Sequence, residues 1–131
     1  MITVLDTSAA IEILLSREHS ENLREYILKS RKVISSDLYK VETANVLWKY
    51  VKSGFIKRDQ VNELLSLVQD LVDEYIDISE NNEESMNEAI RLNHSVYDML
   101  YFTLARRTGA TLLTMDKKLK DLAVSAGLST N

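Results

Sequence analysis

The chain of 131 residues has no cysteine, no proline and only two histidines. Without cysteine it can form no disulfide and no thiolate metal site, which suits a reducing compartment and predicts a cytoplasmic protein. No apolar run approaches the roughly 20 residues that a membrane-spanning helix needs. Because the first residues lack a basic segment and meet an acid at position 6, we expect no secretory signal.

An excess of positive charge is also missing. The chain has 16 Lys and Arg against 20 Asp and Glu, and its formal net charge is −4. This balance argues against a protein that coats nucleic acid. If four of the acids are metal ligands, the 16 remaining acids equal the 16 basic residues. An enzyme that acts on nucleic acid through a local basic rim therefore stays compatible with the composition.

Short apolar stretches alternate with amphipathic ones along the chain. We expect strands over 2–5, 32–36, 75–79 and 110–115. We expect helices over about 8–16, 21–30, 37–52, 57–74, 80–92, 94–108 and 117–126. Such alternation is typical of parallel βαβ units. It predicts one α/β domain over residues 1–131, with helices on both faces of a parallel sheet.

Polar residues and glycines mark the expected helix ends. Thr7 or Ser8 can cap the first helix, and Ser36 or Asp37 can cap the third. Gly54 fits the position just past the end of that third helix. After the last glycine only LSTN remains, which supplies at most a stub of strand.

The stretch VYDMLYFTLA holds a single charge, Asp98. On a helix its face is shared by Tyr101, Phe102 and Ala105. A carboxylate placed there gives up water, which is costly unless something pairs with it. Glu42 repeats the problem, because its helix neighbours at four-residue spacing are also apolar.

Four acids are expected at one edge of the sheet. Asp6 and Asp116 directly follow expected strands. Glu42 lies in the second turn of the helix that follows the strand over 32–36, and Asp98 lies in the first turn of the helix that leads to the last strand. In open α/β sheets, sites form outside the carboxyl ends of the strands. Like charges a few ångströms apart cannot all stay ionised unaided, and a divalent cation removes the conflict.

The ligand chemistry indicates a hard cation. Mg²⁺ favours oxygen ligands and is typically held by one or two carboxylates together with substrate phosphate. Zinc would require the histidine or cysteine that this chain has little or none of. Taken singly, each acid also has a simpler explanation as a helix cap, a turn residue or a partner of a nearby lysine. The joint arrangement carries the prediction, and the two histidines are expected to be structural or on the surface.

Three segments and the order of the acids resemble a known family. The segments are VLDTSA (4–9), VETANVL (41–47) and YDMLYFTLARRTGATLLTMDKKL (97–119), and the acids follow the order Asp, Glu, Asp, Asp. Over essentially its whole length the chain resembles the PIN-domain ribonucleases of the VapC toxin type. The long third segment is the most specific of these features.

The resemblance implies a three-layer α/β/α fold with a central parallel sheet, RNA cleavage dependent on Mg²⁺ or Mn²⁺, frequent homodimers, and a protein antitoxin from a neighbouring gene. The metal-site acids that it implies are Asp6, Glu42, Asp98 and Asp116. The hydroxyl residues that it places beside them are Thr7, Ser8 and Thr114, and Asn45 takes the place of a polar residue that supports the glutamate. The family usually ends with a clear last strand, which LSTN barely supplies.

The mechanism that we predict is phosphodiester hydrolysis by metal-activated water. Asp6 and Asp116 are expected as direct ligands. Glu42 and Asp98 are expected to bind the metal directly or through water, and one of them can orient or deprotonate the attacking water. A basic rim for the RNA backbone is expected from Lys117, Lys118 and Lys120. The apolar stripe within 61–72 is a candidate dimer or antitoxin surface, although such stripes are more often core.

Three other functions stay open. A phosphoacceptor signalling domain would need two adjacent acids after the first strand, where this chain has Asp6 followed by Thr7 and Ser8. A phosphatase with an aspartate nucleophile would need a second acid where Ser8 stands. An inactive PIN-like module that only binds a partner conflicts with the intact set of acids.

Overall fold

The computed structural model describes residues 1–131 and contains one sheet of four parallel strands. The strands are β1 (Ile2–Leu5), β2 (Lys32–Ser36), β3 (Glu74–Ile76) and β4 (Thr111–Leu113). Their order across the sheet is β3-β2-β1-β4, and all three neighbouring pairs are parallel. Val4 of β1 lies opposite Ile34 on one side and Leu112 on the other, so the carboxyl ends of the strands share one edge.

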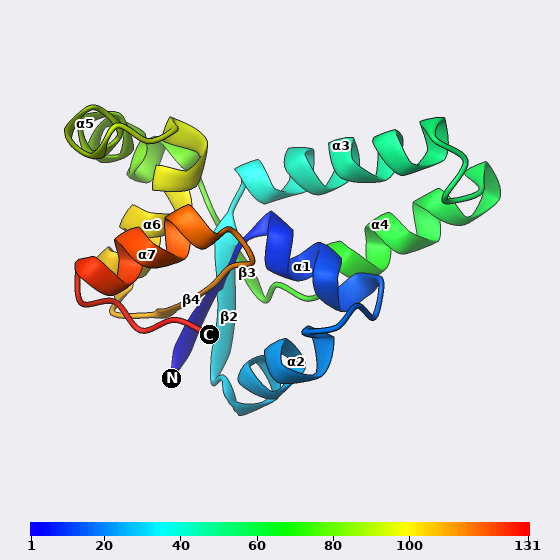
Figure 1. The fold of residues 1–131 in the computed structure, drawn as a ribbon, viewed down its shortest axis with the longest axis horizontal. Helices are drawn as coiled ribbons and strands as arrows, with labels where there is room; N and C mark the ends of the chain where they lie inside the picture. Colours follow the sequence, from blue (N-terminus) through cyan, green and yellow to red (C-terminus); the bar gives the residue numbers. More distant parts are fainter.

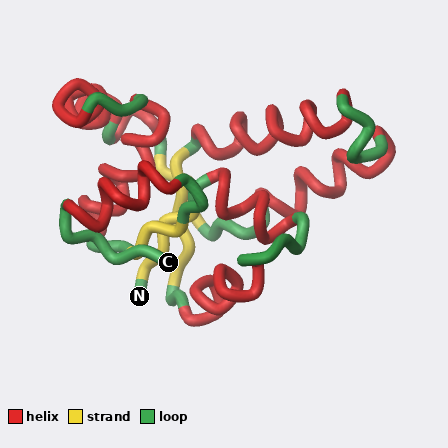
Figure 2. The backbone as a smooth tube through the Cα atoms, viewed as in Figure 1, coloured by secondary structure: helices red, strands yellow, loops and turns green.

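Helices cover both faces of the sheet, as Figures 1 and 2 show. They are α1 (Thr7–Leu14), α2 (Ser20–Lys29), α3 (Leu38–Lys52), α4 (Val61–Gln69), α5 (Asn82–Leu92), α6 (Val96–Thr108) and α7 (Lys117–Ser125). In Figure 1, α5, α6 and α7 lie to the left of the sheet and α1 to α4 lie to its right. The predicted three-layer α/β/α fold is therefore confirmed. None of the helices is both long and apolar enough to cross a bilayer.

Most residues of β1 and β4 are deeply buried because helices pack on both faces of the sheet. Val4 and Leu5 of β1 and Leu112 and Leu113 of β4 have no exposed surface. Strands buried in this way are continuous apolar runs, which is why they stand out in the sequence. Beyond β4 the last residues add one isolated bridge, between Leu112 and Thr130, which matches the stub expected there.

The fourth helix is shorter than its apolar periodicity predicts. A short 3₁₀ turn occupies Arg58–Gln60, and the α-helix ends at Gln69 instead of continuing to residue 74. Beyond it, the amide of Asp73 donates to the carbonyl of Val33 at 2.8 Å, and the Asp73 carboxylate accepts from the Val33 amide at 2.8 Å. This pairing with β2 draws the chain into β3. It depends on a strand distant in sequence and leaves no local signal.

The apolar stripe within 61–72 mostly faces inward. Val68 and Val72 are buried, and Leu65 and Leu71 pack against the core. Only Leu67, with 52% of its surface exposed, points clearly outward. The stripe is therefore core, and the alternative interpretation as a partner surface is wrong for most of it.

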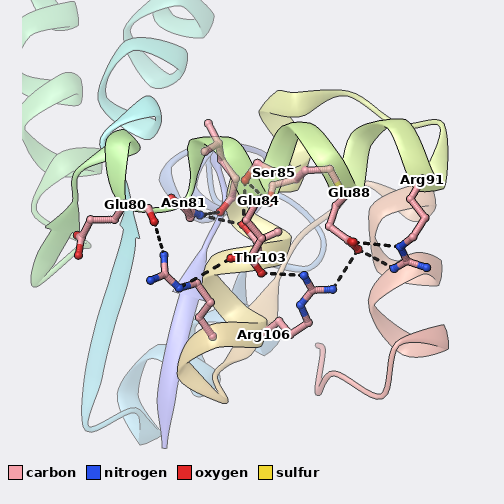
Figure 3. Close-up of polar contacts among 11 residues, drawn as sticks. Glu80, Asn81, Glu84, Ser85, Glu88, Arg91, Thr103 and Arg106 are labelled. Carbon is pink, nitrogen blue, oxygen red and sulfur yellow. Dashed lines mark hydrogen bonds and ion pairs between the residues drawn. The ribbon is translucent and has the colours of Figure 1, made fainter.

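A buried polar cluster fixes α5 against α6 (Figure 3). The side-chain amide of Asn81 donates to the carbonyl of Leu100 at 3.0 Å and to the hydroxyl of Thr103 at 2.9 Å. Ser85 lies 2.9 Å from the same hydroxyl. Because buried polar groups are stable only when they are hydrogen-bonded, this cluster holds α6 in a defined position.

Ion pairs on the surface extend the same contact (Figure 3). Arg106 donates to Glu84 at 2.7 Å and to Glu88 at 3.0 Å, and Arg91 donates to Glu88 at 2.6 Å. Arg107 donates to the carbonyl of Glu80 at 2.6 Å. The arginine pair at the end of α6 thus joins two helices of the same layer.

Candidate active site

Asp6 begins the site at the end of β1. Its amide donates to the carbonyl of Leu113 at 3.1 Å, which keeps β1 and β4 paired up to the edge of the sheet. Its Oδ1 accepts from the amide of Ala9 at 2.9 Å, so Asp6 caps α1. The prediction that Thr7 or Ser8 caps this helix is wrong, because both already lie within its first turn and only Asp6 has the extended backbone of a cap.

Asp116 lies between the end of β4 at Leu113 and the start of α7. It caps α7, with Oδ1 accepting from the amide of Leu119 at 3.1 Å. Its own amide donates to the hydroxyl of Thr114 at 3.0 Å. Asp6 and Asp116 are therefore helix caps that also lie at the carboxyl edge of the sheet. Their role as caps is compatible with a role in the site.

Ser8 joins these two turns. Its hydroxyl donates to Oδ1 of Asp6 at 2.7 Å and accepts from the amide of Met115 at 2.8 Å. The hydroxyl of Thr114 lies 3.3 Å from it. One side chain on α1 thus sets the spacing between the turn that carries Asp6 and the turn that carries Asp116.

Glu42 reaches the same edge from α3. Its Oε1 accepts from the hydroxyl of Thr7 at 3.0 Å and from the phenol of Tyr101 at 2.5 Å. Lys40, one of the lysines that could have paired with Glu42, forms its ion pair with Asp37 instead. Two hydroxyl donors therefore hold this oxygen of the Glu42 carboxylate in place.

Asp98 lies in the first turn of α6, after a sharp turn of the chain. Asn93 ends α5 in the left-handed region with φ of 52°, and Ser95 caps α6 by accepting from the amide of Asp98 at 3.2 Å. Nε2 of His94 lies 2.8 Å from Oδ2 of Asp98, and 29% of the Asp98 side chain is exposed. The carboxylate is thus less buried than its apolar neighbours suggest, and a histidine pairs with it.

The four carboxylates line one cavity of about 350 Å³. The hydrogen bonds described above engage Oδ1 of Asp6 and Asp116, Oε1 of Glu42 and Oδ2 of Asp98. Each acid is therefore anchored through one oxygen.

Burial changes the protonation of the deepest acid. Desolvation raises the pKa of Asp6 from 3.8 to about 6, and the charge of Asp98 acts in the same direction. The Thr114 hydroxyl, the Ala9 amide and the Ser8 hydroxyl oppose this shift. A cation bound beside Asp6 would compensate the repulsion between the carboxylates.

The donor set fits a hydrated hard cation. No three acidic or histidine side chains are gathered closely enough to form a metal cage by themselves. Mg²⁺ does not require one, because it keeps several waters and uses one or two carboxylates together with substrate phosphate. Mn²⁺ accepts the same carboxylate and water ligands.

Other residues that the sequence singled out lie outside this cavity. Asn45 is exposed on α3, makes no hydrogen bond to Glu42, and does not line the cavity. Lys117 and Lys118 are exposed at the start of α7, and Lys120 is half-buried. They follow Asp116 along the chain, next to the cavity and not within its lining.

The sequence did not single out several residues that the structure brings to the site. Tyr101 and Arg17 line the cavity, as does the buried Glu12, and His94 holds Asp98. Spacing gave a signal for two of them, since Tyr101 follows Asp98 by three residues and His94 precedes it by four. Arg17 lies in the turn between α1 and α2, where no periodicity applies.

Comparison with known proteins assigns the family. The model of the PIN domain matches residues 3–125. The chain belongs to the PIN-domain family. Ribonuclease VapC3 of Pyrobaculum aerophilum is 27% identical over 126 residues, which cover 92% of this chain and 94% of that protein.

Solved structures share the fold. PAE2754 from Pyrobaculum aerophilum superposes with a TM-score of 0.77 at 23% identity, over 99% of this chain and 89% of its own. VapBC2 from Rickettsia felis, bound to a DNA fragment from its promoter, superposes with a TM-score of 0.70 at 19% identity, over 100% of this chain and 98% of its own. VapC20 from Mycobacterium tuberculosis, a toxin that cleaves the sarcin-ricin loop, superposes with a TM-score of 0.69 at 15% identity, over 96% of this chain and 95% of its own.

Proposed function

We propose that this PIN-domain protein is a metal-dependent ribonuclease of the VapC toxin type, which hydrolyses RNA phosphodiester bonds in the cytoplasm. The observation that carries the proposal is the set of four carboxylates from four parts of the chain, each anchored through one oxygen, around one cavity. The name of the VapC3 relative, a ribonuclease, supports the same activity.

Asp6, Glu42, Asp98 and Asp116 are the residues that would hold Mg²⁺ or Mn²⁺. When bound, such an ion neutralises charge on the phosphate and lowers the pKa of a water. The chain itself keeps the ligands in place. Ser8 orients Asp6, Thr7 and Tyr101 orient Glu42, His94 orients Asp98, and Thr114 holds the turn before Asp116.

The decisive experiment is cleavage of end-labelled RNA by the purified chain with Mg²⁺ or Mn²⁺, with and without EDTA. Asp98→Asn keeps the shape of the side chain and removes its charge, so we expect cleavage to fall at least about a hundredfold. Asp59→Asn is the matched control, because Asp59 is exposed and outside the cavity. Equal cleavage by Asp98→Asn and the parent chain would reject the site. A parent chain that is inert with both metals would indicate a module that only binds a partner.

We also propose two protein partners, a second copy of the chain and an antitoxin. Support comes from large apolar side chains that are at least half exposed on and around α3 and α4, which project from the sheet in Figure 1. They are Val41, Trp48, Phe55 and Leu67. Sedimentation equilibrium should give twice the chain mass of 15.0 kDa for the parent, and Trp48→Glu should shift that mass toward the monomer. A monomeric parent would reject the homodimer.

A further inference from the structure

Arg17 is the only positively charged side chain that lines the acidic cavity. It follows Ser16, whose left-handed backbone with φ of 50° turns the chain after α1. Although five carboxylates line the same cavity, none lies within ion-pair distance of Arg17. Its position beside acids is therefore not explained by a salt bridge.

Tyr50 of α3 holds the guanidinium instead. Nη2 of Arg17 donates to the Tyr50 hydroxyl at 2.5 Å, and the guanidinium carbon lies 5.6 Å from the centre of the Tyr50 ring. This is the only hydrogen bond of the Arg17 side chain, which has five N–H donors in total. Most of its donors thus remain available, while the hydrogen bond and the contact with the ring position the exposed side chain.

The nearby acids are occupied by other partners. Oε2 of Glu12 accepts from the amide of His19 at 3.0 Å, and Nδ1 of His19 lies 3.3 Å away. Glu42 accepts from Thr7 and Tyr101. The cavity therefore presents carboxylate oxygens suited to a cation together with one fixed guanidinium suited to an anion. A phosphodiester chain with a bound divalent cation supplies both.

We propose that Arg17, held by Tyr50, binds a phosphate of the RNA strand next to the carboxylates. The inference rests on the proposed ribonuclease function and adds a residue that binds the substrate. Because a guanidinium can donate two parallel hydrogen bonds to a phosphate, Arg17 fixes where the strand crosses the cavity.

Binding is measured by fluorescence anisotropy of a labelled 2′-O-methyl RNA oligonucleotide with the full chain in Mg²⁺, over a range of NaCl concentrations, and gel electrophoresis after each titration verifies that the oligonucleotide is uncleaved. We expect Arg17→Gln to weaken binding about tenfold, the effect of one hydrogen bond to a charged group. The plot of log affinity against log salt should become shallower by about 0.7, which corresponds to one lost phosphate contact on a single strand. Arg31→Gln, an exposed arginine just before β2 at the opposite edge of the sheet, should change neither quantity.

The variant Tyr50→Phe distinguishes the effect of the position of the Arg17 guanidinium from the effect of its charge. It keeps the ring and the Arg17 charge and removes the hydroxyl that holds the guanidinium. We expect binding to weaken about threefold, because the guanidinium loses its positioning but keeps its charge, and the salt slope should be unchanged. A salt slope that falls as far as in Arg17→Gln would contradict the role given to Tyr50.

The rival role for Arg17 is to neutralise the acids. In that case Arg17→Gln would strengthen Mn²⁺ binding, measured by electron paramagnetic resonance, and leave RNA affinity unchanged, which would overturn the proposal. A parent chain that cleaves unmodified RNA while Arg17→Gln binds the oligonucleotide equally well would refute this inference alone. A parent chain that neither binds nor cleaves RNA would refute the ribonuclease function as well.

Discussion

The phenol of Tyr101 donates a 2.5 Å hydrogen bond to Oε1 of Glu42, 59 residues earlier in the chain. Thr7 donates to the same oxygen and lies 3.1 Å from the phenol, so α1, α3 and α6 meet at this carboxylate. Burial of the ring, followed by the charge of Glu42, raises the pKa of Tyr101 above its ordinary value. The phenol therefore stays protonated and remains a donor at any physiological pH.

Replacing Tyr101 by Phe should slow RNA cleavage while the fold is kept. The substitution removes one donor from Glu42, and a hydrogen bond to a charged group is worth about 1.5–3 kcal/mol. If most of that positioning is lost in the transition state, kcat falls about tenfold or more, with little change in KM for RNA. Single-turnover cleavage at saturating Mg²⁺ gives the rate directly.

Tyr39→Phe is the matched control for this prediction. Tyr39 is also fully buried, and its hydroxyl donates to the carbonyl of Val68 at 2.6 Å, away from the carboxylates. Tyr39→Phe should lose about 1 kcal/mol of stability, and Tyr101→Phe about 1.5–3 kcal/mol because its hydrogen bond goes to a charged group. Only Tyr101→Phe should lose activity. Equal kcat values for the two variants would show that the phenol of Tyr101 serves stability alone.

Asp6→Asn should stabilise the metal-free protein at neutral pH. The folded-state pKa of about 6 lies above the ordinary 3.8, so the folded state binds the proton more tightly than the unfolded state. Ionised Asp6 therefore destabilises the fold as pH rises from about 4 through about 6. A shift of about two pKa units at about 1.4 kcal/mol each gives a gain of about 2–3 kcal/mol for Asn at pH 7.5.

Thermal or urea unfolding in EDTA at several pH values measures this gain. Asparagine is also a good helix cap, so α1 should be unaffected by the substitution. The gain should vanish below about pH 3, where Asp6 is protonated in both the folded and the unfolded state. It should also shrink when Mg²⁺ is added, because the ion stabilises only the parent. A gain that does not vary with pH would contradict the raised pKa of Asp6.

The sequence predicted most of the sheet because its strands are buried on both faces. β1 and β2 lie over the same residues as expected, since continuous apolar runs such as that ending at Leu5 have few alternatives. The meeting of Asp6, Glu42, Asp98 and Asp116 at one cavity follows from parallel strands, whose carboxyl ends share an edge. That geometry needs no knowledge of side-chain contacts.

The parts that the sequence missed depend on contacts between distant segments. The end of α4 is set where Asp73 pairs with Val33, and neither residue signals the other locally. Arg17 reaches the cavity through a turn and is fixed by Tyr50, 33 residues away. Tyr101 was grouped with the apolar face of its helix because periodicity records the ring and not where its hydroxyl points.

Glu88→Gln should loosen the contact between α5 and α6 in a pH-dependent way (Figure 3). Arg91 first, and then Arg106, lower the pKa of Glu88 from 4.5 to about 2. The carboxylate therefore adds stability above about pH 5, and this contribution is lost as pH falls toward 2. We expect a loss of about 1 kcal/mol at pH 7 for this surface network.

Urea unfolding of Glu88→Gln and the parent at pH 7 and at pH 3 tests whether the stabilising effect of Glu88 is lost as the pH falls. Glu83→Gln is the control, because Glu83 is exposed on the same helix and forms no ion pair. The difference in the free energy of unfolding between Glu88→Gln and the parent should become smaller at low pH and in high salt. A difference that widens as pH falls would mean that Glu88 does not act through its charge.

Lys117, Lys118 and Lys120 follow Asp116 at the start of α7, where they can form a basic rim for the RNA backbone. Replacing all three with Ser should raise KM for RNA and make cleavage less sensitive to salt, because fewer phosphates are neutralised. Metal affinity should stay nearly unchanged, since none of the three lines the cavity. The control replaces three exposed basic residues elsewhere, Lys29, Arg31 and Lys57, for the same change in net charge. An equal rise in KM for both triple variants would mean that the α7 lysines act only through the net charge of the protein. A rise confined to the variant of the α7 lysines would place the RNA strand along that helix.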